Sequence, residues 1–190
     1  MTWEKYYEQF DTLLKKRSGV YAEDDIHHYT EMNIKRTERV LKTVTIPEEV
    51  KAIIQSVRTR QQWELITEHW CGDAAHACPL IYKLSELNPN ISLNIQLRDT
   101  DSEIESYLTD GARSIPKLIV RDEQGEDLFT WGPRPALLQQ LYLDLKEKGF
   151  AVEDIKVEIQ KWYNKDKGVQ ITQEITQLLK KASVLTGTIV

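Results

Sequence analysis

Apolar residues spaced three and four positions apart predict helices at both ends of the chain. The first stripe runs from Trp3 to Leu14 and is followed by three basic residues and Gly19, a composition typical of a helix C-terminus. Further helical stripes cover residues 24–41, 47–57, 134–148, 152–163 and 171–182. The pattern of residues 183–190 predicts neither helix nor strand.

The middle of the chain has the pattern of a sheet. Residues 63–67 form a short apolar run typical of a buried strand, and residues 91–97 alternate strictly between apolar and polar. A helix is predicted between them, over residues 74–87, and a short helix over 101–107. Strand, helix and strand joined by short links predict a right-handed parallel unit.

A hairpin completes the predicted sheet. Residues 117–120 and 127–131 have the composition of strands and flank Glu-Gln-Gly, a turn sequence. We therefore expect an α/β fold with three regions: a helical N-terminal extension (1–60), a central domain (61–148) and a helical C-terminal extension (149–190).

Composition narrows the range of functions. The chain has 190 residues, 41% apolar and 29% charged, with a net charge of −5 and no dominant basic block. Nucleic-acid binding is therefore not expected, because it relies on a concentrated positive surface. No apolar run is long enough to span a membrane, and no signal peptide is visible at the start. We expect a cytoplasmic protein.

The chain has two cysteines, Cys71 and Cys78. Seven residues of helix would separate them by about 10.5 Å along the axis. A disulfide requires Cα atoms within roughly 7 Å. Both cysteines are therefore predicted to be free thiols, with Cys78 a small buried residue on the helix face against the sheet.

Three motifs resemble the thioredoxin family. Trp70-Cys71-Gly72-Asp73 lies between a predicted strand and helix, where thioredoxins carry Trp-Cys-Gly-Pro-Cys. Pro79 has the spacing of the family's helix proline, and residues 111–116 resemble its Gly-Ile-Arg-Gly-Ile-Pro segment. The resemblance covers about half of the chain. It implies a thioredoxin-like fold, a mixed four-stranded sheet flanked by helices, with a cis Pro116 facing Cys71 beside a backbone edge that a peptide can pair with.

Two departures from the family pattern concern the same chemistry. Ala74 stands where thioredoxins have the resolving cysteine, and Leu65 stands where they bury an acid that moves the proton of that thiol. The chain is therefore not expected to reduce disulfides by the usual two-cysteine cycle.

The leading hypothesis is a thioredoxin-like protein that uses Cys71 alone, in thiol exchange or thiol-dependent binding, within cell redox homeostasis. Cys71 would be the nucleophile, and its partner a small thiol or a thiol- or disulfide-containing protein. The residues expected to form the binding groove around it are Trp70, Gly72, Asp73, Ile115 and Pro116. Arg113 and His76 are expected to adjust the thiol, which a helix N-terminus would also activate. No metal and no cofactor is included in this hypothesis.

Other readings stay open. A non-catalytic module would bind a peptide or protein at Pro116, with terminal aromatic stripes, such as those at Trp3 and Trp162, supplying a dimer surface. Asp73 is expected to cap the following helix. A minor alternative is a metal site formed by His69, Cys71, Asp73 and His76. An iron–sulfur site of the monothiol glutaredoxin type is another, although its Cys-Gly-Phe-Ser signature is absent. Whether the chain is an enzyme stays open.

Overall fold

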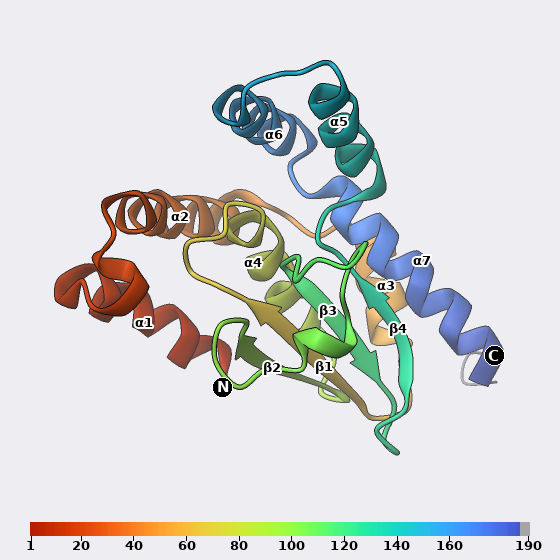
Figure 1. Ribbon diagram of the computed structural model, residues 1–190. Coiled ribbons are helices and arrows are strands. Elements are labelled where there is room, and N and C mark those ends of the chain that lie inside the picture. Colours follow the sequence, from red (N-terminus) through yellow and green to blue (C-terminus); the bar gives the residue numbers. More distant parts are fainter. Residues whose placement is uncertain (187–190) are drawn as a thin grey trace.

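A four-stranded mixed sheet forms the centre of the molecule (Figure 1). The computed structural model describes the backbone of residues 1–186 and the side chains of residues 1–182. The strands are β1 (Gln61–Thr67), β2 (Ile91–Leu97), β3 (Lys117–Arg121) and β4 (Asp127–Trp131), in the order β2-β1-β3-β4. β1 is parallel to β2 and antiparallel to β3, which pairs antiparallel with β4. The predicted α/β class and thioredoxin-like sheet are confirmed.

β1 is an inner strand covered on both faces. Trp63, Leu65 and Ile66 are fully buried, which explains why this segment is apolar rather than alternating. β2, at the sheet edge, keeps the alternation predicted for it. Leu65 packs inside the core, and thus no buried acid lies at this position of the strand.

Helix α4 (Ala74–Ser85) connects β1 to β2 and is buried on nearly all sides. Pro79 lies inside it. Cys78 faces the sheet, where its sulfur lies 3.4 Å from the Thr67 hydroxyl, and both cysteines are free thiols, as predicted. The helix ends two residues before the predicted position, and the Asn88 side chain then binds the carbonyls of Ile54 and Val57.

The N-terminal region consists of α1 (Trp3–Lys16), a 3₁₀ turn (Gly19–Ala22), α2 (Asp24–Thr43) and α3 (Glu48–Gln55). α2 packs along α4, and α1 packs against α2 and β2. The aromatic stripe of α1 covers the chain's own core, since Trp3 stacks on Tyr82 with ring centroids 4.8 Å apart. Buried on its own chain, Trp3 does not offer a surface to a second copy.

The C-terminal region consists of α5 (Ala136–Glu147), α6 (Val152–Asp166) and α7 (Val169–Thr186). α7 runs beside α3 and β4, while α5 and α6 pair with each other at one end of the molecule (Figure 1). Apolar residues of all three predicted regions join one hydrophobic cluster, to which α6 and α7 contribute Ile159, Tyr163 and Ile175 among others.

One predicted segment differs from the structure, and one segment without a prediction begins as helix. The short helix expected over 101–107 is a single 3₁₀ turn, Ile104–Ser106, in which only Ile104 is buried. No element was predicted for residues 183–190; α7 continues to Thr186, and residues 187–190 lie outside the described part of the chain. Within the described residues, no helix combines the length and apolarity needed to cross a membrane.

Candidate functional site

Cys71 lies in the turn between β1 and α4, beside the loop that leads into β3. Its thiol is buried, with the residue 7% exposed, and donates a hydrogen bond to the Ile115 carbonyl over 3.4 Å. The Ile115–Pro116 peptide bond is cis. The turn and the proline loop, far apart in sequence, thus meet at the sulfur atom.

Burial keeps the Cys71 thiol protonated. Its pKa is raised to about 12, first because burial disfavours the thiolate and second because the Asp73 carboxylate is nearby. The backbone N–H groups of Ala74 and Asp73 and the cation of Arg134 act in the opposite direction without compensating. An ordinary cysteine has a pKa of about 8.5, so the thiolate population at neutral pH is about a thousandfold smaller here.

Asp73 does not cap α4. It occupies the N-cap position but makes no side-chain capping bond. Its carboxylate instead forms an ion pair with Arg134, Nη2 to Oδ2 2.7 Å, and accepts a hydrogen bond from the Tyr163 hydroxyl over 3.0 Å. Burial raises the pKa of this carboxyl, and the Arg134 guanidinium opposes the rise. The prediction of a capping role was wrong because these two partners, distant in sequence, compete for the same oxygens.

The pairing register of β3 and β4 places Arg134 beside Cys71 and Asp73. β4 is antiparallel to β3 and Trp131 pairs with Leu118, so the loop after β4 lies beside the start of β3 and its proline. Gly132 has φ +108°, and a Cβ there would lie 2.2 Å from the Pro116 carbonyl oxygen. Sequence reasoning missed Arg134, although the predicted hairpin already implied this proximity.

Arg113 and His76 take other positions than expected. Arg113 pairs with Glu105 at 3.0 Å, so Arg134, not Arg113, is the cation bound to Asp73. His76 faces α6, where its Nε2 lies 2.9 Å from Gln160 Oε1 and its ring stacks on Tyr163 with centroids 4.3 Å apart. Burial lowers the pKa of His76 to about 4, so the ring is neutral at pH 7.

Trp70 and Gly72 border the thiol on either side in sequence. The guanidinium of Arg98 lies over the Trp70 ring, 4.8 Å from its centroid. A Cβ at Gly72 would lie 3.4 Å from Gln160 Nε2 and 3.7 Å from Arg36 Nη1. Both are ordinary van der Waals distances, so side chains of α2 and α6 lie directly beside the turn, and the space would also admit a Cβ.

The four residues considered for a metal site point in different directions. His69 faces α1, with its Nε2 3.0 Å from the Tyr6 carbonyl and its Nδ1 3.3 Å from the Tyr21 hydroxyl. Burial lowers its pKa to about 4. In the part of the chain that the structure describes, no group of three His, Cys, Asp or Glu side chains is arranged to hold a metal. The alternative of a metal site at His69, Cys71, Asp73 and His76 was wrong.

A cleft of about 780 Å³ opens over Cys71. Of the eight predicted site residues, the cleft is lined by six: Trp70, Cys71, Gly72, Asp73, Arg113 and Ile115. Pro116 and His76 are not among its lining residues. The opposite wall comes from α2 and α6, which contribute Arg36, Lys156 and Gln160. These three were missed because their helices lie outside the motifs, and only the packing of both ends of the chain brings them here.

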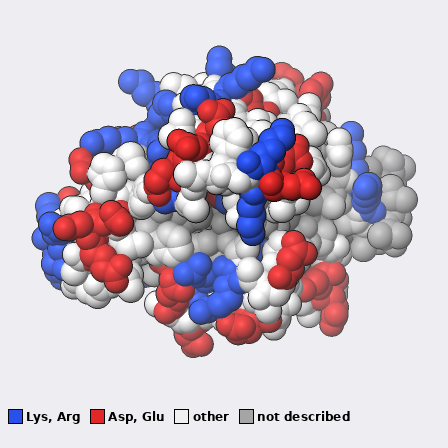
Figure 2. All heavy atoms as spheres, turned by 45° about the horizontal axis from the view of Figure 1, so that its top comes forward, with Lys and Arg blue, Asp and Glu red and all other residues white. Residues whose placement is uncertain are grey.

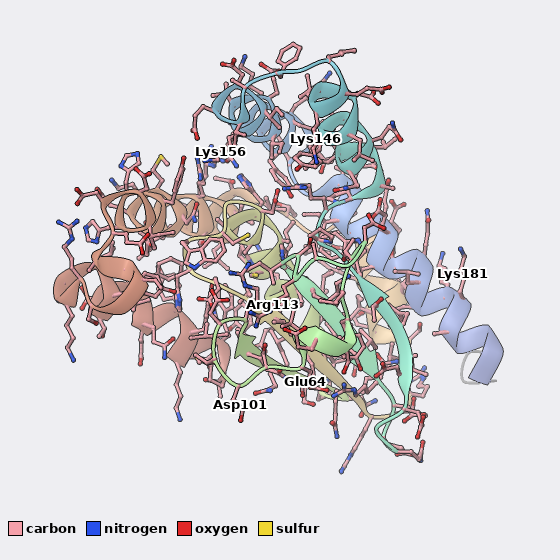
Figure 3. The ribbon with its side chains drawn as sticks, in the orientation of Figure 1. Glu64, Asp101, Arg113, Lys146, Lys156 and Lys181 are labelled. Atoms are coloured by element: carbon pink, nitrogen blue, oxygen red, sulfur yellow. The ribbon has the colours of Figure 1, made fainter. Side chains whose placement is uncertain are left out.

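Basic side chains dominate this cleft. Figure 2 shows Lys and Arg side chains, interspersed with Asp and Glu, around the middle of the face in view. Arg113, on the loop before β3, and Lys156, on α6, approach it from different elements (Figure 3). The cleft thus combines a neutral thiol with a positively charged lining.

Comparison with known proteins agrees with this architecture. The family model described as thioredoxin matches residues 19–156. The chain belongs to the thioredoxin family. A search of curated proteins finds no match. The match to the thioredoxin family model extends beyond the central domain: it includes α2 and the first part of α6, the two helices that form one wall of the cleft.

Two crystal structures share the fold of this thioredoxin-family chain over almost its whole length. One is an HIV epitope scaffold, 14% identical, with a TM-score of 0.54, covering 95% of this chain and 99% of its own. The other is a protein of unknown function from Pseudomonas aeruginosa, 13% identical, with a TM-score of 0.51, covering 96% of this chain and 99% of its own. At such identities the likeness concerns the fold, terminal helices included.

Proposed function

We propose that this chain is a binding module of the thioredoxin fold, whose cleft beside Cys71 and Pro116 receives a ligand. The observation that carries the proposal is the state of Cys71: buried, hydrogen-bonded to Ile115, with a pKa raised to about 12 by burial and by Asp73. Such a thiol contributes a weak hydrogen-bond donor and an apolar surface rather than a nucleophile.

Thiol exchange needs a thiolate and, in a dithiol cycle, a second cysteine. Ala74 occupies the place of that cysteine, and Cys78 lies against the sheet beside Thr67. A mixed disulfide formed at Cys71 would therefore have no neighbouring thiol to resolve it. This supports binding over turnover.

The cleft has the properties of a ligand site. Its volume of about 780 Å³ lies within the ~300–1,000 Å³ of small-molecule sites. Among residues 1–182, the backbone N–H of Ile115 has no hydrogen-bond partner, although the residue is only 6% exposed. A ligand carbonyl at the cleft wall would satisfy this donor.

Single-thiol exchange is the second candidate. It is favoured by one observation, that the N–H groups of Asp73 and Ala74 lower the pKa of Cys71 and would stabilise its thiolate. In that reaction the Cys71 thiolate attacks a disulfide R–S–S–R′, forms Cys71–S–S–R and releases R′–S⁻. Its partner would be a small thiol or a thiol- or disulfide-containing protein. Two free thiols fit a reducing compartment, so a cytoplasmic location is part of either proposal.

The experiment compares wild type with Cys71→Ser. Small molecules and short peptides are screened by the rise in Tm that binding causes, and intact mass is measured after exposure to small disulfides. A binding module gives hits that survive Cys71→Ser, no stable adduct, and negligible reduction of insulin disulfides. Adducts that form readily on wild type, together with loss of every hit in Cys71→Ser, would replace the binding module by thiol exchange. Cys78→Ser is the matched control, because it removes the thiol that lies outside the cleft.

A further inference from the structure

The charge of the cleft is opposite to that of the whole chain. Five lining residues are cationic: Arg36, Arg98, Arg113, Arg134 and Lys156. One lining residue, Asp73, is acidic, so the lining residues alone sum to +4 in a chain with a net charge of −5. Three carboxylates outside the lining, those of Asp99, Glu105 and Glu153, pair with Arg98, Arg113 and Lys156 and reduce this excess to +1. Cations gathered in a concave site attract anions, because the low-dielectric walls focus their field.

Arg36 is the cation with the least internal compensation. Its Nη1 donates to Asn33 Oδ1 over 2.7 Å, and no carboxylate in the described residues forms an ion pair with it. Burial, assisted by the nearby Arg39, lowers its pKa. A half-buried guanidinium without a counter-ion is destabilising unless an anion from outside compensates it.

Arg134 supplies an independent sign of an absent partner. Its Nη2 binds Asp73, and its Nη1 lies 3.2 Å from Gln139 Oε1. Its Nε is buried and has no hydrogen-bond partner among the described side chains. Buried donors are nearly always satisfied in folded proteins, so an unpaired Nε in a residue that lines the cleft is a donor for which the chain supplies no acceptor.

The remaining cations lie on two walls. Arg98 and Arg113 form one, since Arg113 Nη2 donates to the Arg98 carbonyl over 2.9 Å and both approach Asp99. Lys156 belongs to the other, where its Nζ lies 2.8 Å from the Tyr29 hydroxyl of α2. The Lys156 Nζ also pairs with Glu153 at 2.7 Å, so the cations of both walls are already matched by carboxylates of the chain, and a ligand anion would have to share them.

We propose that the cleft binds a small molecule carrying at least two anionic groups, carboxylate or phosphate, with Arg36 as the principal anchor of one of them. The inference rests on the proposed binding function and names its ligand class. Guanidinium groups pair with carboxylates and phosphates through two parallel hydrogen bonds, which gives the site its selectivity for such anions.

The test is isothermal titration calorimetry at low salt with citrate and pyrophosphate as probes, and with end-blocked trialanine as a neutral probe. Citrate represents carboxylate ligands and pyrophosphate represents phosphate ligands. At least one anion should bind saturably, weaken as salt is raised, and slow the alkylation of Cys71. Arg36→Gln should weaken its binding about 10- to 100-fold.

Arg39→Gln is the matched control. It removes one positive charge from the same helix, and the Arg39 side chain points to Asn164 outside this cleft. Its anion affinity should stay within about twofold of wild type, since the Arg39 guanidinium lies outside the cleft, cannot contact the ligand, and acts on it only through a screened charge. Equal weakening in both variants would overturn the inference, because it would indicate attraction by net charge alone.

The experiment distinguishes failure of the anion inference from failure of the proposed binding function. If end-blocked trialanine binds and protects Cys71 while both anions do not, the anion inference is overturned and the binding module stands. If none of the three probes binds, the anion inference is also overturned, and the Tm screen of wild type and Cys71→Ser decides on the binding module. An anion that binds without protecting Cys71 occupies another site and likewise overturns the inference.

Discussion

Replacing Asp73 by Asn should make Cys71 more reactive. The carboxylate of Asp73 is the second-largest cause of the high pKa of Cys71, after burial, and its ion pair also neutralises Arg134. Asp73→Asn therefore removes a negative charge near the sulfur and leaves the positive charge of Arg134 uncompensated. Both changes stabilise the thiolate and lower the pKa of Cys71.

The size of the effect follows from the charges. In wild type, a pKa of about 12 for Cys71 makes alkylation at pH 8 about a thousandfold slower than that of a free cysteine. A single charge within a few ångströms shifts a pKa by ~1 to 3 pH units. The alkylation rate of Asp73→Asn at pH 8 should therefore be about 10- to 1,000-fold higher than that of wild type.

Arg134→Met changes the same ion pair from the other side. It removes the cation that stabilises the thiolate, so the pKa of Cys71 should rise and alkylation should slow. Each variant removes one partner of the buried Asp73–Arg134 pair and leaves the other charge uncompensated, which costs about 3–5 kcal/mol of folding free energy. The two variants are thus alike in stability loss and opposite in the expected change of reactivity.

The assay is the rate of iodoacetamide alkylation between pH 7 and 10.5, followed by mass spectrometry in a Cys78→Ala background. Circular dichroism and urea denaturation verify that each variant is folded. Glu103→Gln is the control, because it disrupts the Glu103–Arg121 pair, whose two residues do not line the cleft. If Asp73→Asn and Arg134→Met both accelerate alkylation, exposure rather than charge controls Cys71 and the electrostatic argument is refuted.

Three further expectations concern stability and chemistry. Burial lowers the pKa values of His69 and His76 to about 4, so the unfolded chain binds more protons than the folded chain between pH ~6.5 and ~4. Each histidine should therefore remove up to about 3 kcal/mol of folding stability as the pH falls through that window. Urea titrations at pH 7 and pH 5 measure this loss, and equal stability at the two pH values would contradict it. Gly132→Ala should destabilise by more than about 3 kcal/mol, because its Cβ would lie 2.2 Å from the Pro116 carbonyl oxygen. Gly125→Ala, also at positive φ but with nothing within 4 Å of its Cβ, should cost only about 1 kcal/mol, and equal losses of Tm would refute the steric argument. The wild-type chain should show no thioredoxin-like turnover with insulin and a dithiol reductant, and robust turnover would contradict the argument from Ala74.

Helices and strands were predicted well because their signals are local. The stripe from Trp3 onward, the alternation of residues 91–97 and the Glu-Gln-Gly turn depend only on neighbouring residues, and each matches an element of the structure. The prediction over 101–107 failed because a segment with only Ile104 buried has too little apolar surface to hold a full helix in place. Asp73 was misread because capping is a local expectation, and long-range partners displaced it.

The amino-acid sequence alone determined the two free thiols and the absence of a cysteine at position 74, and its resemblance to thioredoxins implied the scaffold. Order, spacing and residue identity are properties of the chain in one dimension. Only the tertiary structure decided the character of the site. Burial and the Asp73–Arg134 pair set the state of the Cys71 thiol, and α2 and α6 bring Arg36 and Lys156 to the cleft from opposite ends of the chain. Electrostatic energies depend on distance and solvent exposure, and neither is defined until distant segments pack together.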